Sequence, residues 1–83
     1  MKVIVKYFAS IREAVGVSSE VLETQSATLA ALRDELIARG GAHAQSLRRG
    51  RVVRVALNHV MCDEETALVD GAEAAFFPPV TGG

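Results

Sequence analysis

Residues 73–83 read EAAFFPPVTGG, a short strand pattern that runs into two prolines and ends on two glycines. Alternation along a strand places Glu73 and Phe77 on one face and Phe76 on the other. Because Glu73 belongs in water, Phe77 is expected on the exposed face, whereas Phe76 is expected in the core. Pro78 has a fixed φ of about −65° and no N–H, so a regular strand cannot continue through it. The stretch therefore predicts a final strand that leads into a stiff arm.

The arm, residues 78–83, ends on Gly82 and Gly83, which carry no Cβ. Glycine loses more conformational freedom on ordering than any other residue, so an isolated fold gains nothing from this pair. Such an end can instead pass through a narrow channel and present its terminal carboxylate on the far side. A carboxylate is a poor electrophile, but activation by ATP to an acyl-adenylate supplies a good leaving group. The pattern therefore predicts a reactive terminus that is handed between enzymes.

The remaining hydrophobic patterns predict four more strands and one main helix. Strands are expected at 2–8, 18–24, 52–58 and near 60–62, the last two joined by an Asn58-His59 turn. Thr28 is expected to cap a helix over 28–39 that has Arg33, Asp34 and Arg39 largely on its polar surface. The predicted core consists of Leu29, Leu32, Leu36, Val5, Val53, Val55 and Phe76.

Two further segments have local signals only. Ser10 and Glu13 fit a capping box, which predicts a short helix that starts at Ser10 and stops at Gly16. Residues 42–50 are expected to hold no more than a helical turn, ended by Gly50.

One long helix against a mixed sheet predicts an α+β fold with two layers, in a single domain over residues 1–83. A β-grasp arrangement, with the first and last strands side by side in the centre, is the natural candidate among small α+β topologies. The outer face of its sheet would then hold Ile4, Phe8 and Phe77. A contiguous exposed apolar patch usually marks a protein interface, unless a loop folds over it.

Bulk properties exclude several classes of function. The net charge is −1 and the sequence pI is about 6.1, which argues against a nucleic-acid binder. The arginines at 48, 49, 51 and 54 are therefore interpreted as a solvated rim rather than a binding patch. With Cys62 as the only cysteine and no apolar stretch long enough for a signal peptide or membrane span, we expect a cytoplasmic protein.

At this point the residues resemble a known family. The FFPPVTGG ending, the DGAEAAFFPP run, VRVALN before a turn and YFASIREAVG resemble the small subunit of molybdopterin synthase, a ubiquitin-like sulfur carrier. The resemblance implies that an adenylyltransferase of the ubiquitin-activating type uses ATP on Gly83, and that a sulfurtransferase step makes a terminal thiocarboxylate. It implies no bound cofactor or metal, and a complex whose large subunit supplies the catalytic side chains.

Carried over by position, the resemblance assigns roles to several residues. Gly83 would carry the sulfur that is donated to a cyclic pyranopterin precursor to build the dithiolene of molybdopterin, and Gly82 would be its sterically required neighbour. Phe77 would anchor the large subunit, with weaker assignments for Phe8 and Arg12. The inserted arm would comprise Pro78, Pro79, Val80 and Thr81.

Three alternatives remain open. The chain could be a sulfur carrier of another pathway, such as thiamine biosynthesis, or a β-grasp interaction module with no terminal chemistry. A self-contained enzyme would need Cys62 together with His59 or His43, but no local motif supports such a pair. The spacing of these three residues also matches no recognisable zinc site.

Overall fold

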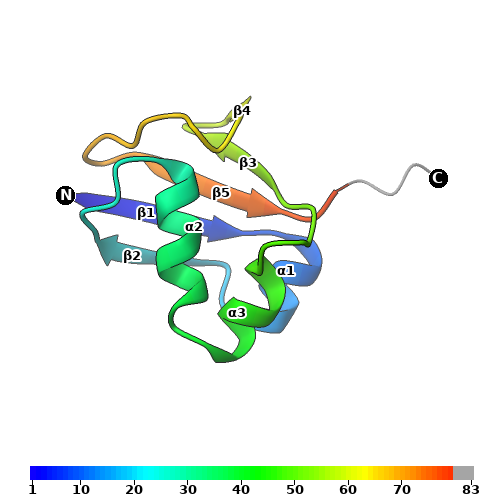
Figure 1. The fold of residues 1–83 in the computed structure, drawn as a ribbon. Coiled ribbons are helices and arrows are strands. Elements are labelled where there is room, and N and C mark those ends of the chain that lie inside the picture. The colour runs from blue at the N-terminus through cyan, green and yellow to red at the C-terminus, as the bar shows by residue number, and fades with distance from the viewer. Residues whose placement is uncertain (80–83) are drawn as a thin grey trace.

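The computed structural model describes residues 1–79, in which strands form a single sheet and helices gather on one side of it (Figure 1). In chain order the elements are β1 (Lys2–Tyr7), α1 (Ala9–Val15), β2 (Ser19–Glu23), α2 (Leu29–Ile37), α3 (Gly41–Leu47), β3 (Arg54–Leu57), β4 (Val60–Cys62) and β5 (Glu73–Phe77). The predicted strands are all present, the last with the predicted bounds.

The first and last strands lie side by side at the centre of the sheet. The strand order is β2-β1-β5-β3-β4, with β1 and β5 parallel and every other pair antiparallel. Parallel pairing puts the ends of β1 and β5 at the same edge of the sheet, opposite the N-terminus (Figure 1). This is the predicted β-grasp arrangement, and it fixes where the arm begins.

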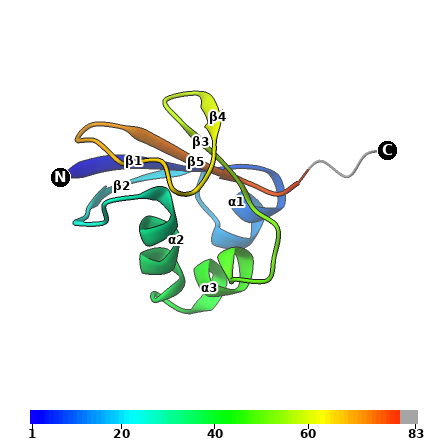
Figure 2. The same ribbon diagram turned by 45° about the horizontal axis from the view of Figure 1, so that its top comes forward.

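The core lies between the inner face of the sheet and the three helices, which share one side of it (Figure 2). Alternation along β1 buries Val3, Val5 and Tyr7, while β5 buries Ala74 and Phe76 on the same face. The helices and loops complete the cluster with Ile11, Leu29, Leu32, Leu36, Leu47 and Leu68. The predicted core is thus confirmed except at Val53, which precedes β3 and is half-buried against the cluster.

Helix α2 begins where the sequence predicts. The Thr28 hydroxyl accepts a hydrogen bond from the Ala31 N–H at 3.1 Å, which satisfies one of the unpaired donors of the first turn. The helix ends at Ile37, two residues short of the prediction. Gly40 and Gly41 follow with positive φ angles of 75° and 56°, which glycine adopts without strain.

The predicted capping box of α1 is wrong. The helix begins at Ala9, its N-cap is Phe8, and no side chain caps it. The reason is tertiary, because the Phe8 N–H donates to the Phe76 carbonyl at 3.1 Å and so keeps the chain extended to that point. The Phe8 carbonyl then accepts from the Ile11 and Arg12 N–H groups, which places Ser10 inside the first turn. Gly16 ends the helix as predicted, with φ of 91°.

Residues 41–47 form a complete short helix, α3, where only a helical turn was predicted. Leu47 is fully buried and Ser46 nearly so, while the flanking glycines gave this segment a loop-like sequence. The helix ends at Leu47 rather than at Gly50, because Arg48 adopts an extended conformation. The added helix packs beside α1 and α2 and brings the following loop toward the arm.

Candidate partner-docking site

The arm begins from β5, the central strand of the sheet. Phe77 pairs with Arg54 of β3, and the preceding Phe76 pairs with Tyr7 of β1. Pro78 is half-buried and Pro79 is exposed. Because Phe77 is paired on one side and the prolines lack N–H groups, the sheet ends there and the arm leaves from a fixed point. The site residues predicted at Val80, Thr81, Gly82 and Gly83 lie outside the described residues.

The outer face of the sheet next to the arm is apolar. Phe8 is 40% exposed and packs edge-to-face against Phe77, with ring centroids 5.3 Å apart and planes at 67°. Phe77 is half-buried, so it lies on the predicted face but is partly shielded by this contact. We define the outer-face patch as the apolar residues that share this side of the sheet, namely Ile4, Phe8, Val21, Ala56, Met61, Ala75 and Phe77.

Charged groups surround this patch. Glu73 forms ion pairs with Lys6 at 3.8 Å and with the imidazole of His59 at 3.2 Å. Arg12 is exposed on α1, one turn after Phe8, and forms no ion pair within residues 1–79. An apolar centre with a charged rim is the usual anatomy of a protein interface.

A hydrogen-bonded cluster on the inner side supports the central strand. The Tyr7 hydroxyl donates to Glu20 Oε2 at 2.6 Å, Arg39 Nη1 donates to Glu20 Oε1 at 2.8 Å, and His43 Nε2 lies 3.1 Å from Glu20 Oε2. Burial works to raise the pKa of Glu20, but the three hydrogen bonds outweigh it and lower the pKa to about 2. Burial and the hydrogen bond to Glu20 raise the pKa of Tyr7 well above its usual value. The cluster is therefore an ionised carboxylate held by donors from β1, from the turn after α2 and from α3.

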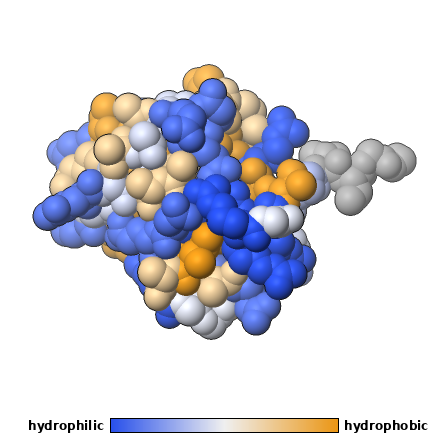
Figure 3. Space-filling model, viewed as in Figure 1, coloured by the Kyte–Doolittle hydropathy of each residue, from blue (hydrophilic) through white to orange (hydrophobic). Residues whose placement is uncertain are grey.

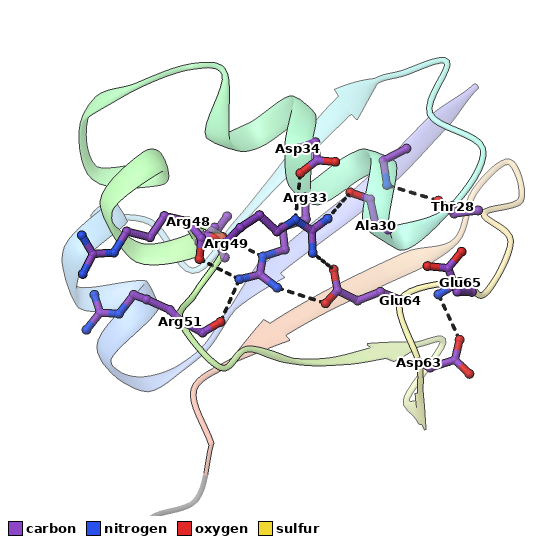
Figure 4. Close-up of polar contacts among 12 residues, drawn as sticks. Thr28, Ala30, Arg33, Asp34, Arg48, Arg49, Arg51, Asp63, Glu64 and Glu65 are labelled. Carbon is purple, nitrogen blue, oxygen red and sulfur yellow. Dashed lines mark hydrogen bonds and ion pairs between the residues drawn. The ribbon is translucent and has the colours of Figure 1, made fainter.

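A second polar cluster contradicts the predicted exposure of Arg33. Its guanidinium is buried, donating from Nε to the Leu47 carbonyl at 2.6 Å and from Nη2 to the Arg48 and Arg51 carbonyls at 2.9 and 3.0 Å (Figure 4). Its Nη1 donates to Glu64 Oε2 at 3.0 Å. Arg33 thus fixes the loop between α3 and β3, and residues 50–53 of this loop lie beside Pro78 and Pro79.

Arg49 shares the same carboxylate. It donates to Glu64 Oε1 at 2.8 Å, to Asp34 Oδ1 at 3.0 Å and to the Ala30 carbonyl at 3.0 Å (Figure 4). Glu64 therefore bridges Arg33 and Arg49, and Arg49 is not part of a free basic rim. The only sequence signal for this network was the clustering of arginines at 48–54, and it did not identify their partners.

The alternative of a self-contained enzyme gains no support from the described residues. Cys62 is half-buried, as expected for a small apolar residue. The two histidines are engaged elsewhere, His43 with Glu20 and His59 with Glu73. Within residues 1–79 no group of three metal-binding side chains comes together, and no helix is long and apolar enough to cross a bilayer.

Comparison with known proteins decides the family. The ThiS family model matches residues 5–83, which is nearly the whole chain. The chain belongs to the ThiS family. Two relatives carry the name molybdopterin synthase sulfur carrier subunit. The one from Haemophilus influenzae is 43% identical over 79 residues, covering 95% of this chain and 96% of that protein. The one from Escherichia coli is 38% identical, with the same coverage.

The solved structures agree with the fold of this ThiS-family chain. In a complex of subunits 1 and 2 of the molybdopterin-converting factor from Helicobacter pylori, the matching chain has a TM-score of 0.69 and 30% identity, and both chains are covered completely. The β-grasp fold and the resemblance to the small subunit of molybdopterin synthase, both predicted from the sequence, are thereby confirmed.

Proposed function

We propose that this chain is the sulfur-carrying small subunit of molybdopterin synthase. The observation that carries the proposal is the continuity between the outer-face patch and the start of the arm through the Phe8–Phe77 contact. A protein that covers the patch would therefore lie next to the start of the arm, which supports the proposal. The names of the relatives at 38–43% identity support the same assignment.

In the proposed reaction the carboxylate of Gly83 attacks the α-phosphorus of ATP on an adenylyltransferase of the ubiquitin-activating type, releasing pyrophosphate. A sulfurtransferase step supplies sulfur at the oxidation level of sulfide, which attacks the acyl carbon, breaks its bond to AMP and leaves a thiocarboxylate. The thiocarboxylate then donates its sulfur to a cyclic pyranopterin precursor, and hydrolysis of the acyl group restores the carboxylate. ATP acts as a substrate of the activating enzyme, so the carrier itself needs no bound cofactor.

The partner in the last step is the large subunit, which supplies the catalytic side chains. The Helicobacter pylori complex of subunits 1 and 2 supports such a pairing. In the proposed complex of this chain with its large subunit, Phe77 would act as the central anchor, since partly shielded aromatic residues beside a charged rim are typical interface hot spots. The arm over 78–83 would enter the active site of the large subunit.

The experiment that tests the proposal compares the intact chain with a Gly83 deletion and with Gly82→Val. Each protein is incubated with the activating enzyme, a sulfur donor and ATP, and its mass is measured for the exchange of one oxygen by sulfur. The products are then combined with the large subunit and the precursor, and dithiolene formation is followed. The deletion withdraws the carboxylate by one residue, about 3.5 Å. A misplacement of ~1 Å can already lower a rate a hundredfold.

We expect both variants to melt at the same temperature as the intact chain and to form no dithiolene. Gly82→Val keeps the carboxylate in register and adds a branched side chain, so it tests the requirement for a slender chain end separately. Normal product formation by the Gly83 deletion would overturn the proposal and favour an interaction module without terminal chemistry.

A further inference from the structure

A groove lies beside the start of the arm, on the helix side of the sheet. It has a volume of about 440 Å³ and opens between α1, α3, the loop 50–53 and the first two residues of the arm. Its lining includes Ile11, which is buried, Val53, which is half-buried, and Pro78. At this end of the molecule hydrophobic and strongly hydrophilic surface lie next to each other (Figure 3). The proposed function does not account for this groove.

Three arginines of the chain are paired with carboxylates, and the cations around the groove differ from them. Arg33, Arg39 and Arg49 all form ion pairs with carboxylates. By contrast, Arg51 lines the groove, and within residues 1–79 its guanidinium donates only to the Gln45 carbonyl, at 3.2 Å. The Arg48 side chain forms no ion pair within residues 1–79, and it extends in the same direction as Arg51, away from Glu64 (Figure 4). Cations are thus concentrated at this end of a chain whose net charge is −1.

A polar group that lines the groove also has no hydrogen-bond partner among the described residues. Ser46 is only 6% exposed and contributes to the lining, yet its hydroxyl forms no hydrogen bond with another residue among 1–79. No fully enclosed side-chain oxygen or nitrogen of the described residues is unsatisfied, so this hydroxyl is reached from the groove. A hydroxyl that is reached from the groove can donate to or accept from a polar group of an occupant. The groove therefore offers an apolar floor, a hydroxyl and a guanidinium to one occupant.

We infer that this groove binds an acidic segment of the large subunit, in which a carboxylate stands next to an apolar side chain. The inference rests on the proposed function. Residues 80–83 can span at most about 14 Å. A large subunit that encloses Gly83 must therefore come close to Pro79, which forms part of the groove wall. Its carboxylate would accept hydrogen bonds from Arg51, and its apolar side chain would cover Ile11 and Val53.

Charge placed in this way acts mainly on the rate of association. Complementary charges steer two proteins together and can raise the association rate by about 10–1,000-fold, an effect that falls with added salt. A merely solvated rim would give no such dependence on one position, because exposed charges more than a Debye length from an interface are screened. The two interpretations of the arginine cluster are therefore distinguishable by kinetics.

The test measures association with the large subunit, at low and at physiological ionic strength, for two variants that lower the net charge equally. Arg51→Gln removes a cation beside the groove, and Gln25→Glu adds an anion in the exposed loop after β2, far from the arm. We expect Arg51→Gln to slow association about three- to tenfold at low salt and less at high salt. Gln25→Glu should change it less than twofold.

A second pair of variants tests the groove without changing charge. Ala14→Trp on α1 fills the groove from an exposed position, and Ala38→Trp places the same side chain at the exposed end of α2. We expect Ala14→Trp to weaken binding at least tenfold and Ala38→Trp to have little effect, with all four variants melting like the intact chain. In an NMR titration with the large subunit, the amides of Ser10, Ser46 and Val53 should shift.

The outcomes separate the two hypotheses. If the intact chain binds the large subunit and forms dithiolene, but the groove variants match their controls, the groove inference is wrong and the proposed function stands. If the groove variants affect only binding to the adenylyltransferase, or only self-association, the occupant has been misidentified. If the intact chain does not bind the large subunit at all, both the proposed function and the inference fail.

Discussion

Replacing Arg33 by Met removes one buried guanidinium and keeps a side chain of similar length. In the native fold this group bonds the carbonyls of Leu47, Arg48 and Arg51 and the carboxylate of Glu64, at 2.6 to 3.0 Å. The methionine retains the apolar contacts of the arginine stem, so cavity formation contributes little. The variant therefore isolates the polar contribution of the guanidinium to the stability of the loop after α3.

The expected loss is large for a chain of this size. Removing one partner of a buried ion pair typically destabilises a protein by about 3–5 kcal/mol, because the remaining charge stays away from water without the opposite charge that it was paired with. The 83 residues imply a total unfolding free energy of about 4–12 kcal/mol. With an unfolding entropy of ~2.1 cal/mol/K per residue, that loss corresponds to a decrease in Tm of roughly 15–30 °C. If the total lies at the low end of that range, Arg33→Met brings the chain to the limit of folding at room temperature.

The matched control is Arg49→Met, which removes a guanidinium that contacts the same Glu64. The side chain of Arg49 is 48% exposed, against 4% for Arg33, so water replaces its contacts when it is removed. Exposed ion pairs contribute about 0–1 kcal/mol. Thermal unfolding followed by circular dichroism, with urea titration at 25 °C, measures both variants. If Arg33→Met lowers the unfolding free energy no more than Arg49→Met does, the burial of an arginine side chain does not determine how much it contributes to stability.

Three further predictions follow from the packing, the interface and the ionisation of the cluster. Leu32→Ala, at a fully buried position of α2, should lower the unfolding free energy by about 2–5 kcal/mol in urea titrations. Phe77→Ala should weaken binding of the large subunit by about 2 kcal/mol in calorimetry while Tm changes little. A lost thermal transition would instead identify Phe77 as a core residue. Glu20 has its pKa lowered to about 2, so its contribution is complete above the unfolded value of about 4.3 and disappears as the pH falls toward 2. The unfolding free energy of Glu20→Gln should therefore be lower at pH 7 and should fall less steeply across that window than that of the intact chain. Equal pH slopes of the unfolding free energy would contradict this origin.

Periodicity and turn residues were sufficient to predict the sheet and the main helix. In β1 and β5 only one assignment of the alternating residues leaves the lysines and the glutamate in water, and Thr28 marks the start of α2. The same reasoning predicted that Phe77 shares the outer face with Phe8, because parallel pairing of the central strands brings their last residues together.

The errors share a physical cause, which is contact between residues distant in sequence. Arg33 was predicted on the surface because its neighbours are polar, but its partners come from residues 14 to 31 positions later. The start of α1 was misplaced because the bond from Phe8 to Phe76 overrides a locally favourable cap. The groove was not predicted at all, since α1, α3 and the arm are adjacent only in the folded chain.

The position of the start of the arm is consistent with the chemistry proposed for Gly83. β5 has a strand on each side, and the bond from Phe8 to the Phe76 carbonyl continues that pairing up to the edge of the sheet. Pro78 ends the ladder because it has no N–H, so the arm begins at a point fixed by β1 and β3. From that point the number of residues determines the reach, at about 3.5 Å each. For a partner docked on the outer-face patch, the length of the arm therefore sets the greatest distance at which the terminal glycine can lie from that patch.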